Sequence, residues 1–362
     1  SATWEGFVVS LNVPKRSLGA ALDLMADVVQ RPAFTANDVR RQRDLRAAGI
    51  LQRRDQPNAL ASLAYNSLLF PASHPYHNPP DGDSASTARL DSARVRDFYA
   101  RAFVPSRAKF TVVGDITPAE ASELIGARFG RWSSSGQPLP IAAVTATATG
   151  NTATKVFLID KPGAAQSVIT LGGPGVSRMS ADYPALVVMN TLLGASFSSR
   201  LNSNLRETKG YTYGIGSSFA WAPVPSAFRV GSGVRTDVTD SSLVEIFREL
   251  RMIQDSVVPD VELARGKAYV ALGIPGDFET NAGIAGQLLE VDSYKLPLSS
   301  VSDFIAKVNA VTAADVQRVA RTYLPADRAT IVVVGDLAKI RAGIEALRLG
   351  PITVLDVNAI VK

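Results

Sequence analysis

An arginine and a tyrosine seven residues apart are the side chains in this sequence best suited to act on a carbonyl group. Arg206 and Tyr213 lie in LLGASFSSRLNSNLRETKGYTYGIGSSF, residues 192–219. A guanidinium and a phenol that face one cleft can donate hydrogen bonds to a carbonyl oxygen or a developing oxyanion. A structural interpretation is also open: the arginine binds carbonyl groups at a helix C-terminus, and the tyrosine packs on a sheet.

The local sequence indicates elements that would bring these two side chains together. Ser198 or Ser199 can cap a helix that Gly210 ends. A strand follows directly. Arg206 would then lie on the last turn of the helix and Tyr213 near the start of the strand, so that both can face one cleft.

The two histidines of the chain, His74 and His77, form a His-x-x-His pair that invites a metal-binding interpretation. They lie in PASHPYHNPPDG, where Pro and Gly indicate a loop, and no third ligand stands nearby. We therefore expect a structural role for them. The sequence contains no cysteine, which excludes disulfides, thiolate metal sites and a cysteine nucleophile.

The composition is that of a globular protein able to bury sizeable cores. Of the 362 residues, 46% are hydrophobic and 20% are charged. No run of about 18 apolar residues occurs, so we expect no membrane span. The net charge of +5 comes from scattered Lys and Arg. The densest cluster, within residues 38–46, alternates with aspartates, which favours a solvated helix face over a nucleic-acid partner.

Two pairs of similar segments, about 220 residues apart, indicate a duplicated domain. Residues 107–115 read RAKFTVVGD, and residues 328–336 read RATIVVVGD. Each is a β-branched run closed by Gly-Asp, which is typical of a buried strand that leaves into a turn. Residues 38–50 align with residues 262–274 at an offset of 224. This period is too long for a solenoid and indicates two copies of one domain.

The duplication divides the chain into a first domain over residues 1–137, a linker over 138–154 and a second domain over 155–362. The first copy begins where the second has already run for about 70 residues, so we expect it to lack an N-terminal portion. Partly alternating strands and clustered helices favour an α+β sandwich, with helices on one face of a mostly antiparallel sheet. A doubly wound parallel fold is the alternative, but no Gly-x-Gly-x-x-Gly motif supports it.

The pattern predicts both strands and amphipathic helices. The predicted strands cover residues 7–13, 109–115, 155–160, 167–173, 211–219, 228–234 and 330–336. The predicted helices include residues 17–30, 118–129, 241–254 and 337–348.

The sequence resembles the pitrilysin-type zinc peptidases, the family of mitochondrial processing peptidase and insulin-degrading enzyme, over nearly its whole length. The Arg-x6-Tyr pair of that family matches Arg206 and Tyr213. The resemblance implies that these residues contact the substrate carbonyl and stabilise the tetrahedral intermediate. It rests on KPGAAQSVITLG (161–172), LLGASFSSRLNSNLRETKGYTYG (192–214), FET (278–280), LFPASHPY (69–76) and both VVGD segments.

The same resemblance implies that this sequence cannot complete a zinc site. The family binds zinc through an inverted His-x-x-Glu-His motif, and no such string occurs here. The third family ligand is a glutamate on a downstream helix, and Gly49 stands at the corresponding position. Glycine has no side-chain oxygen, so a zinc site with three protein ligands would be incomplete.

We therefore expect the non-zinc-binding subunit of a heterodimeric zinc peptidase, inactive alone. A homologous partner subunit would carry the zinc and the general base, and Arg206 and Tyr213 would bind the peptide substrate. The alternative is an inactive assembly protein, like the core subunits of bc1 complexes. An active homodimer with a longer N-terminus is opposed by Gly49. The Ala- and Arg-rich composition indicates a GC-rich bacterium. Because bacterial members of this family are often exported, the resemblance implies a periplasmic location over the cytoplasm or an organelle matrix.

Overall fold

The computed structural model describes residues 1–134, 136–141 and 143–361, which form two compact units. Unit 1 is assigned Ser1–Ile50, Pro80–Ala143 and Pro275–Ser293. Unit 2 is assigned Leu51–Pro79, Val144–Ile274 and Tyr294–Lys362. Each unit therefore takes one short segment from the other side of the predicted linker, so the compact units differ from the domain division predicted over residues 138–154.

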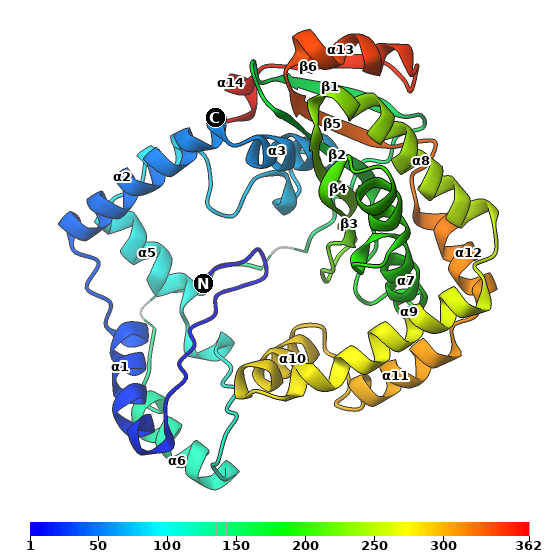
Figure 1. Cartoon of the computed structure of the whole chain (residues 1–362). Coiled ribbons are helices and arrows are strands. Elements are labelled where there is room, and N and C mark those ends of the chain that lie inside the picture. Colours follow the sequence, from blue (N-terminus) through cyan, green and yellow to red (C-terminus); the bar gives the residue numbers. More distant parts are fainter. Residues whose placement is uncertain (135, 142, 362) are drawn as a thin grey trace. The chain divides into compact units, whose positions relative to one another are not determined.

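Unit 2 contains a six-stranded sheet with the order β3-β4-β2-β5-β1-β6 (Figure 1). Neighbours from β3 to β5 are antiparallel, and β1 is parallel to both β5 and β6. This arrangement confirms the predicted α+β class with a mostly antiparallel sheet. The strands are β1 (Lys155–Asp160), β2 (Gln166–Pro174), β3 (Thr212–Phe219), β4 (Ala227–Arg235), β5 (Thr330–Gly335) and β6 (Ile352–Leu355).

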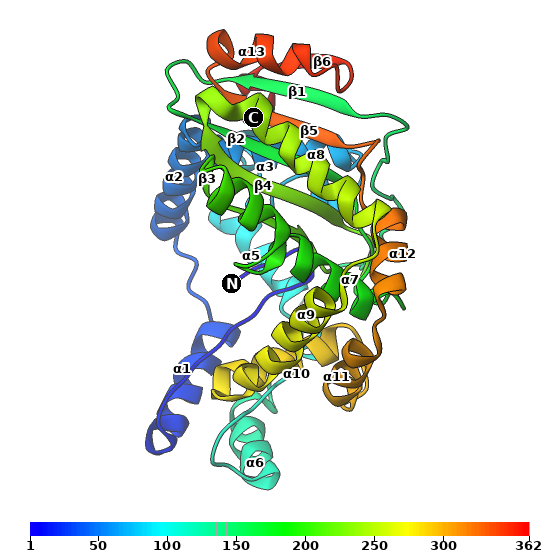
Figure 2. The ribbon, with the colours of Figure 1, turned by 45° about the vertical axis from the view of Figure 1, so that its right-hand side comes forward.

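Helices cover both faces of this sheet, so the prediction of helices on one face was wrong, because β5 buries side chains on both faces. Figures 1 and 2 show α7 and α8 on one face and α3 on the other. Because strand side chains alternate between faces, Ile331 and Val333 of β5 enter the main core, whereas Val332 and Val334 are buried on the opposite face. The helices of unit 2 are α3 (Pro57–Leu69), α7 (Tyr183–Asn190), α8 (Thr239–Asp255), α9 (Asp260–Gly273), α11 (Ser300–Ala310), α12 (Ala313–Tyr323), α13 (Leu337–Ala346) and α14 (Val357–Ile360).

A buried tyrosine fixes α3 to the sheet. The hydroxyl of Tyr65 donates to the carbonyl oxygen of Phe228 at 2.6 Å, and its burial raises the pKa of the phenol well above the usual range. Gly172 makes this approach possible, because a Cβ there would lie 2.4 Å from the tyrosine oxygen. This hydrogen bond therefore fixes the position of α3 on its face of the sheet.

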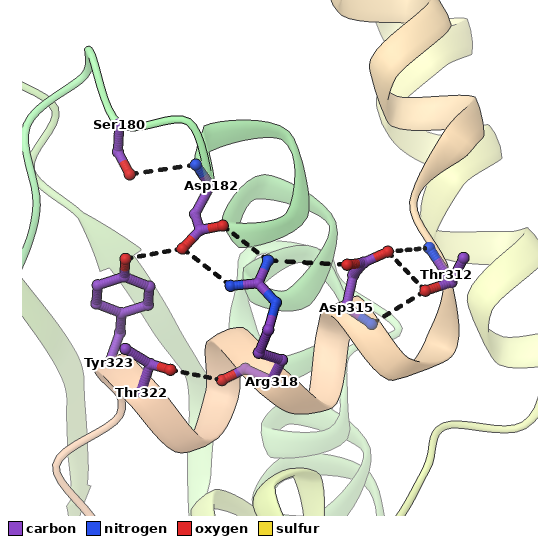
Figure 3. Close-up of polar contacts among 7 residues, drawn as sticks. All are labelled: Ser180, Asp182, Thr312, Asp315, Arg318, Thr322 and Tyr323. Carbon is purple, nitrogen blue, oxygen red and sulfur yellow. Dashed lines mark hydrogen bonds and ion pairs between the residues drawn. The ribbon is translucent and has the colours of Figure 1, made fainter.

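A polar network joins the start of α7 to α12 (Figure 3). The carboxylate of Asp182 accepts two hydrogen bonds from Arg318, at 2.7 and 3.1 Å, and one from Tyr323 at 2.8 Å. These bonds, those from Arg318 above all, hold the pKa of Asp182 below its usual range. Thr312 and Asp315 form a capping box that starts α12. The network therefore fixes two helices that pack on the same core.

Asp182→Asn is expected to lower the free energy of unfolding at pH 7 by about 1 kcal/mol, since Arg318 is half-exposed and the pair is partly screened. The folded pKa of Asp182 is depressed, so its contribution is present above the unfolded value of about 3.9 and is lost as the pH falls through the folded pKa. Urea unfolding at pH 7 and pH 3 measures this difference. Exposed Asp327→Asn is the control, and an equal effect from both variants would contradict the assignment.

Unit 1 is helical in the described residues, with a small core where Ala26 and Val29 of α1 meet Phe129 of α6. Within this unit, Lys109 pairs with Asp292 of α10 at 2.6 Å. The helices that lie in it wholly or mostly are α1 (Leu18–Gln30), α2 (Ala36–Gln52), α4 (Ser84–Ala88), α5 (Ser92–Ala102), α6 (Pro118–Phe129) and α10 (Asn281–Ser293).

The strands predicted at residues 7–13 and 109–115 do not form, and this part of the prediction was wrong. Both segments lack a strand ladder, and an isolated bridge joins Ala2 to Phe7. Phe7 and Phe110 are 49% and 43% exposed. Alternating apolar residues indicate an extended chain, whereas a strand also needs a hydrogen-bonded neighbour, which the pattern does not reveal.

Two helices in equivalent sequence positions lie in opposite units. Pro57–Leu69 (α3) and Asn281–Ser293 (α10) each have 13 residues. Their offset of 224 is the one that aligns residues 38–50 with 262–274 in the sequence. The α3 helix belongs to unit 2 and α10 to unit 1. Each unit thus receives one helix from the other half of the chain.

Candidate functional site

The segment that precedes β3 contains two π-helical turns separated by a short loop. They are η5 (Thr191–Ala195) and η6 (Asn202–Thr208). The chain is helical from Arg200, and Gly210 ends the helix with a φ of 62°, as the sequence predicts. The π winding was not predicted. It is uncommon in proteins and is frequently found at functional sites.

Two asparagines attach this segment to the edge of the sheet. Asn190 donates to the carbonyl oxygen of Ser217 at 3.1 Å, and the backbone N–H of Ile215 donates to Asn202 at 3.1 Å. Both asparagines are at most 9% exposed. Since β3 is an edge strand, these amides take the place of a neighbouring strand. At Gly194 a Cβ would lie 2.6 Å from the Ser217 nitrogen, so only glycine allows this close approach.

Tyr213 lies on a bulge at the start of β3. The pairing with β4 shifts register between Thr212 and Ile215. The hydroxyl of Thr212 accepts from the N–H of Gly214 at 3.0 Å and donates to the carbonyl of Gly233 at 2.7 Å, which holds the bulge. Tyr213 is 91% exposed. It therefore projects from the sheet, against the structural interpretation in which it packs on the sheet.

Arg206 lies in the last turn of η6, three residues before the lysine that caps it. Its guanidinium carbon is 4.2 Å from the centroid of the Phe197 ring, and its Nη1 is 3.0 Å from a carboxylate oxygen of Glu207. The side chain is 31% exposed. These contacts involve side chains instead of the helix C-terminal carbonyls that the structural interpretation requires. Arg206 and Tyr213 thus lie on the predicted elements, at the helix end and the strand start on either side of Gly210, whereas a shared cleft stays a prediction.

The opposite side of η6 is clamped by buried carboxylates. The amide of Asn204 donates to Glu245 at 2.8 Å and to Glu249 at 2.7 Å. Burial raises the pKa of Glu249, whereas the hydrogen bond from Asn204 lowers that of Glu245. Arg200 also makes two 2.7 Å bonds to Glu262 of α9. This cluster was not predicted, although two glutamates four residues apart among the apolar positions of α8 signal a buried polar contact.

Asn204→Ala is expected to lower the free energy of unfolding by about 1–3 kcal/mol at pH 8, because two buried carboxylates lose their shared donor. The raised pKa of Glu249 means that charging it costs stability as the pH rises through the folded value. The destabilisation should therefore be smaller at pH 5 than at pH 8. Urea unfolding at both pH values measures it, with exposed Asn309→Ala as the control. A pH-independent effect would contradict the role assigned to the carboxylates.

The two histidines have structural roles. His74 is 2% exposed and accepts a hydrogen bond at Nδ1 from the backbone N–H of Tyr76 at 3.1 Å. Burial lowers its pKa, and Nδ1 of His77 lies 2.7 Å from the carbonyl oxygen of Phe70. Residues 1–134, 136–141 and 143–361 contain no group of three or more side chains able to hold a metal ion. Nor does any helix in these ranges have the length and apolar character needed to cross a bilayer.

Gly49 occupies an exposed position in α2, and a Cβ added there would meet no heavy atom within 4 Å. Neither packing nor a left-handed backbone therefore requires glycine at this position.

Comparison with known proteins identifies the family. The sequence profile described as the peptidase M16 inactive domain matches residues 89–270, half of the chain. The chain belongs to the M16 peptidase family. This confirms the resemblance to the pitrilysin-type zinc peptidases, and the matched domain is of the inactive type.

Some relatives of this chain are named as zinc proteases, and one is named as a probable inactive metalloprotease. An uncharacterized zinc protease of Mycobacterium tuberculosis is 30% identical over 201 residues, which is 56% of this chain and 45% of that protein. The chain thus spans less than half of that relative's length. A probable inactive metalloprotease of Bacillus subtilis is 20% identical over 304 residues, covering 83% of this chain and 70% of that protein.

A solved M16 structure has the same fold. The crystal structure of a peptidase M16 inactive domain from Pseudomonas fluorescens has a TM-score of 0.80 at 27% identity. The match covers 89% of this chain and 75% of that one. The family profile thus covers half of this chain, and the structural match covers 89% of it.

Proposed function

We propose that this M16 chain is the non-zinc-binding subunit of a two-chain zinc peptidase, in which Arg206 and Tyr213 bind the carbonyl of the scissile peptide bond. The observation that carries this proposal is the presentation of the two donors. Tyr213 projects from a bulge and is 91% exposed. Arg206 is held by Phe197 and Glu207 just across the Gly210 turn.

The two side chains would act on the charge that develops during peptide hydrolysis. Zinc and a general base on a homologous partner subunit would supply an activated water. The guanidinium N–H groups of Arg206 and the hydroxyl of Tyr213 would donate to the carbonyl oxygen of the substrate. Because these bonds strengthen as the oxygen becomes an oxyanion, they would stabilise the tetrahedral intermediate more than the bound substrate.

The sequence at Gly49 supports this division of labour. The family places a glutamate ligand there, and the structure offers space for a side chain. A glycine that packing does not require fits a position released from metal binding. We also propose a periplasmic location for the two-chain enzyme, with a peptide as substrate and no nucleic-acid partner.

The test is to co-purify the chain with a homologue that carries the His-x-x-Glu-His motif and to measure peptide hydrolysis. Loss of one oxyanion donor typically costs about 10²–10³ in kcat, so Arg206→Ala and Tyr213→Phe should each reduce kcat by about that factor. KM should rise by a smaller factor, because the same donors also bind the carbonyl of the unreacted substrate.

The matched controls change an arginine and a tyrosine elsewhere in unit 2. Arg251→Ala removes a guanidinium 5.7 Å from the ring of Phe247 in α8, and Tyr269→Phe removes a half-exposed phenol in α9. Both should retain the wild-type rate. Unchanged rates in the Arg206 and Tyr213 variants would refute the roles proposed for them. Stable assembly without cleavage in any pairing would support the alternative, an inactive assembly protein.

Gly49→Ala is expected to raise the free energy of unfolding by about 0.5–1 kcal/mol, because alanine restricts the unfolded chain and favours the helix. Peptide hydrolysis by the two-chain enzyme should not change. Thermal and urea unfolding measure the first effect, and the hydrolysis assay measures the second. A destabilised variant would show that α2 needs glycine for a reason other than metal-ligand loss.

A further inference from the structure

The loop between η5 and η6 holds one aromatic side chain out of the protein while its neighbours are fixed inside. Ser196 donates to the carbonyl oxygen of Thr191 at 3.0 Å. Asn202 donates to the carbonyl oxygen of Ser196 at 3.3 Å and to the hydroxyl of Ser199 at 3.2 Å. Ser196 and Ser199 are 7% and 0% exposed, whereas Phe197 is 68% exposed. The position of the phenylalanine is thus set by buried hydrogen bonds on both sides of it.

The exposed ring lies against the guanidinium of Arg206, with 4.2 Å between the guanidinium carbon and the ring centroid. An aromatic ring attracts a cation through its face. The N–H donors of a guanidinium lie in its own plane and at its edge. Nη1 of Arg206 is buried beside Glu207, so the donors left to reach a carbonyl oxygen are those on Nε and Nη2. The rest of the Phe197 ring stays open to solvent.

A carbonyl bound by Arg206 would bring the adjoining part of its peptide close to Phe197. The side chain next to a peptide carbonyl lies within a few ångströms of it, about the distance that separates the ring from the guanidinium. Contact with an apolar side chain would remove the exposed ring surface from water, which is favourable. A basic side chain would instead approach the charge of Arg206, which is unfavourable.

We propose that Phe197 forms an apolar subsite that selects peptides with an aromatic or aliphatic side chain next to the carbonyl bound by Arg206. The position of this subsite beside the scissile bond rests on the proposed role of Arg206.

The experiment measures peptide binding by the purified chain without a partner. Three fluorescein-labelled, blocked alanine-rich hexapeptides differ at one central position, which carries Phe, Ser or Lys. Fluorescence anisotropy should give a Kd about tenfold lower for the Phe peptide than for the Ser peptide, equivalent to about 1.4 kcal/mol. The Lys peptide should bind most weakly.

Variants separate the subsite from the carbonyl donor. The Phe197→Ser variant should bind the Phe and Ser peptides equally. The Phe197→Leu variant, which keeps an apolar side chain, should retain most of the preference for the Phe peptide. Arg206→Ala should raise the Kd of both peptides by a similar factor and leave the preference for the Phe peptide unchanged. Matching thermal unfolding curves would confirm that the exposed Phe197 variants remain folded.

Each outcome bears on a different assignment. Equal binding of the Phe and Ser peptides to the wild type, no measurable binding, or a preference that survives Phe197→Ser would overturn the subsite. If Phe197→Ser abolishes the preference while Arg206→Ala has no effect on binding, the subsite stands and the carbonyl role of Arg206 fails.

Discussion

The arrangement around Arg206 and Tyr213 depends on how the edge of the sheet satisfies its backbone hydrogen bonds. β3 has a strand on one side only, and an uncovered edge exposes N–H and C=O groups to any passing chain. Asn190 and Asn202 satisfy part of this edge with their amides. Their positions, at the end of α7 and the start of η6, fix the whole intervening segment against the strand. The position of Phe197 and the start of η6 follow from that attachment.

The carboxylates behind η6 complement the attachment to β3. A polar group buried without a partner is costly, so Glu245 and Glu249 constrain Asn204 as strongly as Asn204 constrains them. One side of η6 is thereby bound to α8 while the other carries Arg206. A helix held in this way can present a charged side chain in a defined position although that side chain is partly in water. Preorganisation of this kind distinguishes an oxyanion donor from a surface arginine.

The sequence predicted those features of the fold that depend on the spacing of apolar residues and on local composition. Every strand expected from residue 155 onward is present, and so are the four amphipathic helices. Arg206 and Tyr213 lie where the cap at Gly210 placed them. The π winding was not predicted. The bulge at Tyr213 was not predictable, because it depends on the pairing with β4. Residues 7–13 and 109–115 were misassigned for a related reason: strand pairing is a tertiary property.

The exchange of α3 and α10 between the units bears on how the chain reaches its native state. Tyr65 bonds to a strand more than 160 residues later in sequence, and α3 also packs on β5, which comes later still. During synthesis, α3 leaves the ribosome long before the sheet that it covers has been made. Contacts of such long sequence separation form slowly, because closing the loop costs entropy before any contact is gained. Until β5 emerges, the apolar face of α3 lacks the strand that covers it in the native state.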